Sequence, residues 1–461
     1  MSDTKSNKIA AVILAGDMGE SMRSNTPLVM HPLAGQPLIL YTINATKKAI
    51  GDFPFLVIEK DNEQIQQLFD QSAKHIVLDE QKASAYPLQL TEPLLRNTVD
   101  YLLVISADMP LLTSTTLEQI LAAHHDPIEG VQSPSPITVL SFQTTDSQNY
   151  ARVIRGEDGN IEAITDRPDD SADGLEPAEC DAGVYCFTAE WLWQALSISS
   201  GSEYRLIDMV QMAVADGLPV KSINLTNPIE ALRIENRIDL AEAEAVLRQR
   251  INEDLMLNGV TIIDPSSTYI DAQVEIGLDT VIHPNTYLRG TTRIGEGCTI
   301  GPNCFVVDTT IGDRCEIIFS ETENAILEDD VDIGPFAHLR KGAHLAQGVH
   351  MGNYGEVKNS YLGPGTKMGH FSYIGDATIG PGVNIGAGVI TANYDGENKH
   401  HTEIGAGAFI GSDSMLIAPL KIGEGARTGA GSVVTKDVPA NSLAVGIPAR
   451  VIRKKEDKDG S

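Results

Sequence analysis

The second half of the chain contains side chains that can move a proton or hold a carbonyl group. His370 stands in the string Gly-His-Phe-Ser-Tyr at residues 369–373. An imidazole takes up and releases a proton near pH 7, so this histidine could serve as a general base. Asn393 and Tyr394 follow, and both side chains can donate hydrogen bonds to a thioester or amide oxygen.

Two polar segments, Arg340–Asn359 and Ala392–His401, place basic side chains in a strongly acidic chain. The 461 residues include 34 Lys and Arg against 63 Asp and Glu, which gives a formal net charge of −29. Guanidinium and ammonium groups gathered together suit a phosphate monoester. These segments could therefore hold an anionic ligand, whereas the surface as a whole repels nucleic acid and anionic lipid.

These residues lie within a short repeat that begins near Val274. An aliphatic residue followed by Gly recurs at spacings that are mostly multiples of six or close to it, in the pairs Ile276-Gly277, Ile294-Gly295, Ile300-Gly301, Ile311-Gly312, Ile333-Gly334, Leu362-Gly363, Ile379-Gly380, Ile385-Gly386, Ile404-Gly405, Ile410-Gly411 and Ile422-Gly423. This period predicts a solenoid of short strands with inward aliphatic side chains and Gly at corners. The two polar segments interrupt the pattern, and insertions of this kind often build the binding site.

The first 227 residues show a different pattern, in which strands alternate with helical segments. The segments are Ala10–Leu14, Leu38–Lys48, Phe55–Ile58, Tyr101–Ile105, Leu117–His124, Ile137–Phe142, Val184–Phe187 and Leu206–Ala215. This alternation predicts a mostly parallel α/β sheet with ligands at the carboxyl ends of its strands. We expect a linking helix over residues 228–258, a β-helix over 259–452 and a charged tail over 453–461.

Composition argues against several other classes of protein. The five cysteines are an odd number without C-x-x-C spacing, which indicates neither a disulfide framework nor a zinc site. The polar N-terminus lacks the layout of a signal peptide, and no stretch approaches the ~20 apolar residues of a membrane span. We therefore expect a cytoplasmic protein without membrane insertion.

Both halves together resemble the bacterial bifunctional N-acetylglucosamine-1-phosphate uridyltransferase/glucosamine-1-phosphate acetyltransferase family. The most specific strings are His-Leu-Arg-Lys-Gly-Ala at 338–343, Gly-Asn-Tyr-Gly-Glu-Val-Lys at 352–358, Gly-His-Phe-Ser-Tyr-Ile-Gly-Asp-Ala at 369–377, Asn-Ile-Gly-Ala-Gly at 384–388, Asn-Tyr-Asp-Gly-Glu-Asn-Lys at 393–399 and Gly-Ser-Asp at 411–413. A generic hexapeptide-repeat acyltransferase shares the Ile-Gly rhythm but lacks these strings.

The resemblance implies a fold class, an assembly and a biosynthetic role. The fold class is an α/β, Rossmann-like nucleotidyltransferase domain followed by a left-handed parallel β-helix, which departs from the usual right-handed crossover. The assembly is a homotrimer with acetyl-transfer sites between neighbouring helices. The role lies in UDP-N-acetylglucosamine biosynthesis, and hence in peptidoglycan and cell wall biogenesis.

The resemblance also assigns individual residues. His370 matches the base that deprotonates the amine of glucosamine 1-phosphate before it attacks the thioester of acetyl-CoA. The sugar-phosphate contacts match Arg340, Lys358, Tyr373, Asn384 and Lys399, and the acetyl-CoA contacts match Ala387, Asn393, Tyr394, Ser412 and Ala430. The family often has an Arg near the last coil that meets the CoA phosphate. Ile447 is its closest counterpart here, and we assign the role to Arg450.

The first half departs from the family where phosphates should bind. The family's opening loop reads L-x-x-G-x-G-T-R-M and is followed by P-K-x-L. Here Asp17 replaces a Gly, Ser21 replaces the Arg and Leu28 replaces the Lys, while Glu20 adds a second carboxylate. Each new anion would oppose triphosphate binding by about a kcal/mol or more in a partly desolvated site.

Other parts of the expected nucleotide site have also changed. The uracil-recognition segment, Q-x-x-x-x-G-T-x-x-A in the family, reads Gln-Lys-Ala-Ser-Ala-Tyr at residues 81–86. The aspartate that would bind Mg²⁺ is retained as Asp108, but its Asn partner is replaced by Glu235. We therefore predict an acetyltransferase whose uridyltransferase half is inactive.

Alternative functions remain open from the sequence. One is a fully bifunctional enzyme that also makes UDP-N-acetylglucosamine from UTP with Mg²⁺. Another is a non-catalytic assembly or binding protein. The acceptor could also be galactosamine 1-phosphate, because the choice depends on the surroundings of one hydroxyl group.

Overall fold

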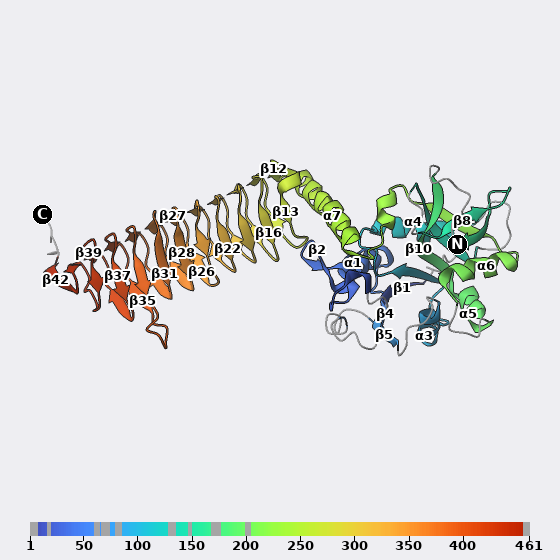
Figure 1. The fold of residues 1–461 in the computed structure, drawn as a ribbon, viewed down its shortest axis with the longest axis horizontal. Coiled ribbons are helices and arrows are strands. Elements are labelled where there is room, and N and C mark those ends of the chain that lie inside the picture. Colours follow the sequence, from blue (N-terminus) through green and yellow to red (C-terminus); the bar gives the residue numbers. More distant parts are fainter. Residues whose placement is uncertain are drawn as a thin grey trace, which may run out of the picture. The chain divides into compact units, whose positions relative to one another are not determined.

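The computed structural model describes residues 8–15, 20–59, 65, 74–78, 85–127, 135–145, 150–166, 177–198 and 204–454 (Figure 1). The chain forms two compact units, Met1–Val246 and Leu247–Ser461. The predicted replacement Asp17 and most of the expected uracil segment, residues 81–84, lie outside the described residues. Within the described part of the chain, no helix is long and apolar enough to cross a membrane.

The first unit contains a central sheet with the strand order β11-β7-β10-β6-β1-β4-β5. Its strands are β1 (Ile9–Ala15), β4 (Phe55–Glu59), β5 (Lys74–Leu78), β6 (Tyr101–Ser106), β7 (Ile137–Thr144), β10 (Ala178–Thr188) and β11 (Val220–Asn224). Strand β10 is antiparallel to both of its neighbours, and the other pairs along this order are parallel. The mostly parallel α/β sheet expected from the sequence is therefore present.

Helices cover both sides of this sheet. They are α1 (Leu38–Ile50), α3 (Tyr86–Leu95), α4 (Ser114–His125), α5 (Ala189–Ile198) and α6 (Leu206–Ala215). Alternate residues of β1 point to opposite sides, as a pleated strand requires. Ala10 and Val12 join an apolar cluster with residues of α5 and α6, whereas Ala11 joins a second cluster with residues of α4.

Smaller elements complete the first unit. They are the 3-10 helices η1 (Glu20–Met22), η2 (Leu28–Met30) and η3 (Pro228–Ala231), the pair β2 (Pro32–Leu33) and β3 (Gln36–Pro37), and the hairpin β8 (Arg152–Arg155) and β9 (Ile161–Thr165). The linking helix α7 (Arg237–Leu257) begins later than the predicted position 228. The side chain of Asn236 accepts hydrogen bonds from the backbone N–H groups of Ile238 and Asp239, which fixes its start.

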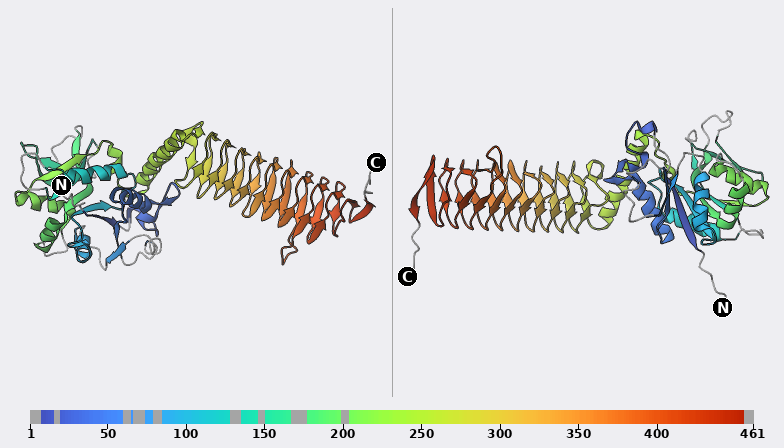
Figure 2. Two further views of the ribbon diagram at one scale, coloured as in Figure 1. Left: turned by 180° about the vertical axis from the view of Figure 1, so that it is seen from behind. Right: turned by 90° about the horizontal axis from the view of Figure 1, so that it is seen from below.

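The second unit is a solenoid in which successive coils contribute short strands to three sheets (Figure 2). Face I contains β12 (Thr261–Ile262), β15 (Val281–Ile282), β18 (Thr299–Ile300), β21 (Glu316–Ile317), β24 (Asp332–Ile333), β27 (His350–Met351), β30 (Lys367–Met368), β33 (Asn384–Ile385), β36 (Phe409–Ile410), β39 (Arg427–Thr428), β41 (Ser442–Gly446) and β42 (Ala449–Lys454). A short 3-10 helix, η4 (Pro265–Ser267), lies in the first coil.

The other two faces are built in the same way. Face II contains β13 (Tyr269–Ile270), β16 (Tyr287–Arg289), β19 (Phe305–Val307), β22 (Glu321–Glu323), β25 (His338–Leu339), β28 (Gly355–Lys358), β31 (Ser372–Gly375), β34 (Ile390–Ala392), β37 (Met415–Ile417) and β40 (Val433–Val434). Face III contains β14 (Glu275–Ile276), β17 (Arg293–Ile294), β20 (Thr310–Ile311), β23 (Ile326–Leu327), β26 (Ala343–Leu345), β29 (Ser360–Leu362), β32 (Ala377–Ile379), β35 (Thr402–Ile404) and β38 (Leu420–Ile422).

The aliphatic residues of the repeat fill the interior of this solenoid, as predicted. All the aliphatic members of the Ile-Gly and Leu-Gly pairs are buried except Ile276, which is half-buried. Corner glycines are required where coils approach closely. A Cβ atom at Gly352 would overlap the backbone carbonyl of Gly369 in the next coil.

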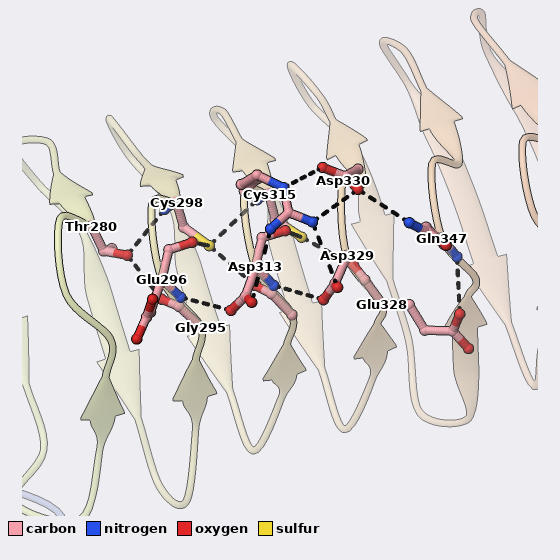
Figure 3. A network of polar contacts seen from close by, with 12 residues as sticks. Thr280, Gly295, Glu296, Cys298, Asp313, Cys315, Glu328, Asp329, Asp330 and Gln347 are labelled. Atoms are coloured by element: carbon pink, nitrogen blue, oxygen red, sulfur yellow. Dashed lines mark hydrogen bonds and ion pairs between the residues drawn. The ribbon is translucent and has the colours of Figure 1, made fainter.

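Polar side chains tie neighbouring coils together at the corners (Figure 3). One Asp313 carboxylate oxygen accepts the backbone N–H of Glu296 at 2.9 Å, and Asp329 accepts the N–H of Asp313 at the same distance. Arg314 donates from Nε to Asp330 at 2.7 Å. The two bonds to Asp313 and Asp329 satisfy backbone donors at the corners, where the strand ladders end, and the Arg314 bond links side chains of neighbouring coils.

One predicted interruption of the repeat is present and the other is not. Residues 393–401 form a loop between β34 and β35, and this loop protrudes beside β35 in Figure 1. In contrast, the segment Arg340–Asn359 contains the regular strands β26, β27 and β28, so its prediction as an insertion is wrong. The five cysteines are all buried and free.

Candidate functional site

Four of the predicted site residues form a straight row along the edge between faces I and II. His370, Ala387, Ser412 and Ala430 are each the second residue after a face I strand, in four successive coils. Backbone hydrogen bonds hold these turns in line: Gly388 N–H donates to Phe371 O, Asp413 N–H to Ala387 O and Gly431 N–H to Ser412 O, at 2.6–2.8 Å. We call this set the edge row.

The edge row offers a small, open surface beside an imidazole. His370, Ser412 and Ala430 are exposed and Ala387 is half-buried. Among the described residues, nothing hydrogen-bonds or ion-pairs with the His370 side chain, so both ring nitrogens are open to a ligand. The row can therefore place an extended ligand along the solenoid axis with one end next to a proton acceptor.

Arg450 lies at the C-terminal end of this row. Strand β41 follows β39 on face I, with Thr428 paired to Ala444, so Gly446 continues the edge row after Ala430. Arg450, on β42, pairs with Val445 in the antiparallel register. Its guanidinium is exposed and donates to the backbone oxygen of Ala449 at 3.1 Å. Ile447, at the family's usual arginine position, is 77% exposed and contributes no charge.

A second set of predicted residues lies on face II, next to its edge with face III. Arg340, Lys358 and Tyr373 come from the end of β25 and from β28 and β31, which are neighbouring strands. Lys358 is in register with Gly375, and a Cβ atom at Gly375 would overlap the Tyr373 ring, so the ring lies across this glycine. Arg340 donates to Glu356 at 2.8 Å, and this bond raises the pKa of the guanidinium.

Asp376 connects this set to the protruding loop. Its carboxylate accepts one hydrogen bond from Asn359 at 2.6 Å and another from the predicted site residue Asn393. Burial alone would raise the pKa of Asp376, but these two bonds and the charges of Lys399 and Lys358 bring it below its usual value. The carboxylate is therefore ionised at neutral pH. It interacts electrostatically with Lys358 and Lys399, the two lysines that are predicted to bind the substrate phosphate.

The protruding loop is held by its own hydrogen bonds. The Tyr394 hydroxyl donates to the carbonyl of Gly396, and Tyr394 and Lys399 form an isolated antiparallel bridge. Asp395 accepts a hydrogen bond from the backbone N–H of Asn398, and its carboxylate also contacts Nε2 of His400. Both contacts lower the pKa of the Asp395 carboxyl. Asn393 is buried at the base of the loop, whereas Tyr394 is 61% exposed.

The predicted residues are not all brought together within one chain. The face II set and the loop lie near one edge of face II, and His370 lies at the opposite edge, three residues before Tyr373. Asn384 is on β33 of face I, in register with Lys367 and Phe409. Its neighbour Ile385 points into the core, so the Asn384 side chain points outward from face I. The outward directions of faces I and II diverge, so Asn384 does not join the face II set.

In the first unit, the predicted metal ligand Asp108 is engaged by an arginine. It follows β6 at the carboxyl end of the sheet, and its Oδ2 accepts hydrogen bonds from Nε and Nη2 of Arg233 at 3.0 and 2.7 Å. Asp108 is only 3% exposed. The Asp108 charge raises the pKa of Arg233. Glu235, which replaces the family's Asn as the expected partner of Asp108 in binding Mg²⁺, is exposed, and its backbone N–H donates to Asp239.

A cavity of about 280 Å³ lies beside this ion pair, and its lining includes Asp181, Arg205 and Arg233. Asp181 is buried and accepts hydrogen bonds from the Tyr185 hydroxyl and from Gly183 N–H. Burial raises its pKa to about 6, against a usual value of 3.8.

The changed phosphate-loop positions differ in their surroundings. Leu28, which stands where the family has Lys, is buried and packs as an apolar residue, whereas Ser21 is exposed. Neither position therefore supplies a cation.

Sequence reasoning assigned no role to Asp376 or Arg233. Asp376 stands within the string Gly-His-Phe-Ser-Tyr-Ile-Gly-Asp-Ala at residues 369–377, so its position in the sequence is a usable signal. Arg233 carried no local signal, because its partner lies 125 residues away in the sequence.

Comparisons with known proteins agree with this two-part architecture. The MobA-like NTP transferase domain family matches residues 11–157, and the bacterial transferase hexapeptide family, defined by six repeats, matches residues 273–308 and 401–436. These matches confirm the predicted fold class, an α/β nucleotidyltransferase-like domain followed by a left-handed β-helix of hexapeptide repeats.

Close relatives cover nearly the whole chain. The Bifunctional protein GlmU of Shouchella clausii (strain KSM-K16) is 37% identical over 439 residues, which are 94% of this chain and 95% of the relative. The proteins of the same name from Geobacillus sp. (strain WCH70) and Geobacillus thermodenitrificans (strain NG80-2) are 38% and 39% identical, with 97% of each chain covered.

Proposed function

The chain belongs to the family of the bifunctional protein GlmU, and we propose that its second unit transfers acetyl from acetyl-CoA to the amine of glucosamine 1-phosphate. The product is N-acetylglucosamine 1-phosphate. The observation that carries this proposal is the edge row, which places small residues for a long thin co-substrate in line with an exposed imidazole.

The proposed chemistry assigns a role to each set. His370 removes a proton from the ammonium group, because only the neutral amine has a lone pair to attack the thioester carbonyl. Acetyl-CoA lies along Ala387, Ser412 and Ala430, with Arg450 near its phosphates. The second N–H of the Asn393 amide donates a hydrogen bond to its carbonyl or amide groups, and the Tyr394 hydroxyl does so after turning away from Gly396.

The face II set holds the sugar phosphate. Arg340 and Lys358 bind the phosphate, and Tyr373 supports the sugar ring beside them. Lys399 approaches from the protruding loop, with Asp376 fixing the position of the two lysines. Charge attraction here is local, because the chain as a whole is strongly anionic.

A complete site needs more than one chain. Asn384 points outward from face I, away from the face II set, yet the family resemblance assigns all of these residues to one substrate. We propose that neighbouring β-helices of a homotrimer supply the two faces. Mass measurement in solution should give three chains, and a fully active monomer would contradict the shared site.

We also propose that the first unit does not transfer uridylyl groups. Ser21 and Leu28 supply no cation for the phosphates, and Arg233 engages the carboxylate of Asp108. The alternative is a fully bifunctional enzyme, as the name of its relatives would suggest. A non-catalytic assembly protein is disfavoured by the exposed imidazole and by the basic set on face II.

A substrate panel tests the acetyl-transfer proposal. The protein is mixed with acetyl-CoA and either glucosamine 1-phosphate, galactosamine 1-phosphate or glucosamine 6-phosphate, and free thiol is followed. We expect rapid thiol release with glucosamine 1-phosphate. Preference for galactosamine 1-phosphate would reassign the acceptor, and no release with any sugar would overturn the proposal.

A further inference from the structure

The ion pair between Asp108 and Arg233 occupies the position that the family resemblance assigns to a divalent metal. Both bonded nitrogens of the guanidinium, Nε and Nη2, converge on the same carboxylate oxygen. The other oxygen, Oδ1, is buried and lacks a hydrogen-bond partner among the described residues. Glu235 and Asp181 lie close enough to interact electrostatically with the same guanidinium.

These residues do not fit a bound Mg²⁺ ion. Magnesium requires near-octahedral oxygen ligands at about 2.0–2.1 Å and usually keeps several waters. Here one carboxylate oxygen is covered by a cation and the other is closed to solvent. A divalent ion would also lie within a few ångströms of a fixed positive charge, which repels it strongly in a partly buried site.

We propose that the Arg233 guanidinium takes the place of the metal ion. As a cation that belongs to the chain itself, it neutralises Asp108 and blocks metal binding at this position. The backbone supports the arrangement, because Ile234 N–H donates to the Asp108 carbonyl oxygen at 2.9 Å. The segment that carries Arg233 is thereby fixed to the residue that it neutralises. The proposal rests on and deepens the loss of uridylyl transfer proposed above, and the family resemblance identifies the metal position.

Manganese binding to the full-length protein tests this inference. Free Mn²⁺ is measured by its electron paramagnetic resonance signal during titration of the wild type, Arg233→Ala and the double variant Arg233→Ala/Asp108→Asn. We expect Arg233→Ala to bind one more Mn²⁺ per chain than the double variant. The dissociation constant of this additional site should be at least tenfold lower than that of any Mn²⁺ site at Asp108 in the wild type. The wild type and Asp108→Asn should bind Mn²⁺ equally.

Two control variants separate charge from general damage. Arg233→Lys keeps the positive charge and should gain no Mn²⁺ site. Arg155→Ala frees a different carboxylate of the first unit, that of Glu179, which Arg155 holds with bonds of 2.7 and 2.6 Å, and it should also gain none. Folding is followed by the fluorescence of Trp191 and Trp193, which both lie in α5.

Several results would overturn the inference. A wild-type Mn²⁺ site that is lost in Asp108→Asn would show that the metal position is open, and this comparison stands even if Arg233→Ala does not fold. A folded Arg233→Ala without a new site, or an equal gain in Arg155→Ala, would also contradict it. None of these outcomes depends on acetyl transfer or pyrophosphate release.

Discussion

His370 combines exposure, freedom from partners among the described residues and a place at the head of the edge row. We expect His370→Ala to lower kcat for acetyl transfer by ~10²–10⁴-fold, the usual contribution of a general base. Binding of acetyl-CoA should change little, because the rest of the row is intact. Steady-state kinetics and calorimetry with acetyl-CoA measure the two effects.

His350 provides a matched control for this substitution. It is an exposed histidine on β27, one coil before His370, and its ring interacts with Asp332. His350→Ala should retain near-normal kcat. If His370→Ala also retains it, the amine loses its proton to another group and the base is misassigned.

Asp181 makes a prediction about pH and stability in the first unit. Its carboxyl has a pKa of about 6 in the folded chain and a usual value of 3.8, so the folded state binds the proton more tightly. Stability from this group is therefore fully present below pH 3.8 and is lost as pH rises through 6. The loss amounts to about 3 kcal/mol.

The titration of His124 changes the stability of the first unit in the opposite direction, over nearly the same pH range as that of Asp181. Burial, followed by the charge of Lys221, lowers its pKa to about 4, so its contribution is lost as pH falls from 6.5 toward 4. The two effects oppose each other in the wild type. We expect Asp181→Asn to be about 3 kcal/mol more stable than the wild type at pH 7 and nearly equal to it at pH 4.

Urea unfolding followed by tryptophan fluorescence measures this difference, because both tryptophans report on the first unit. A difference between variant and wild type that does not change with pH would show that Asp181 titrates normally in the folded chain.

At the scale of single residues, the strings of the second half carried most of the information. They predict His370 and the residues of the edge row and face II as site residues, and the structure places these residues in two separate sets. They do not predict the ion pair between Arg233 and Asp108, because an ion pair between distant segments depends on tertiary packing and not on a local sequence pattern. The divergence of Asn384 from the face II set likewise depends on which sheet each strand joins.

The coil is the element whose prediction succeeded most fully, and its one error has a physical explanation. The segment Arg340–Asn359 lacks Ile-Gly pairs, yet Leu339, Leu345, Met351 and Val357 recur at intervals of six and are all fully buried. The inward position requires an apolar side chain but not a following Gly at every corner. An apolar residue at every sixth position therefore predicts a coil better than the Ile-Gly dipeptide does.

The corner glycines make a testable prediction for coil stability. Gly352→Ala would place a methyl group against the backbone carbonyl of Gly369, and backbone cannot move aside as a flexible side chain does. Overpacking of this kind costs about 2–3 kcal/mol. Because coils depend on their immediate neighbours, amide hydrogen exchange should increase around residues 340–375 and little elsewhere.

Gly369→Ala serves as the matched control, because its Cβ atom would meet only the His350 ring, at 3.7 Å. This variant should exchange like the wild type. Equal protection of both variants would show that the coils have more room at this corner than the structure indicates.

At the scale of the whole molecule, the divergence of faces I and II requires chains to share a site. Lys358→Ala and Asn384→Ala should each lower kcat/KM as pure homotrimers. When the two variants are unfolded together and refolded as a mixture, about one quarter of the sites should recover both native residues.

Acetyl transfer by the mixture, compared with the two variants refolded separately, measures this recovery. Activity equal to the average of the separate variants would mean that one chain supplies both residues. The faces would then have to be brought together in a way that the solenoid does not show.

The central claim is that this chain acetylates glucosamine 1-phosphate and stops there. One reaction containing acetyl-CoA, glucosamine 1-phosphate, UTP and Mg²⁺ tests it most directly, with free thiol and pyrophosphate followed in the same sample. A bifunctional relative that forms both products is the positive control. We predict thiol release without pyrophosphate. Pyrophosphate released in step with thiol would contradict the account, because the first unit would then be making UDP-N-acetylglucosamine despite Ser21, Leu28 and Arg233.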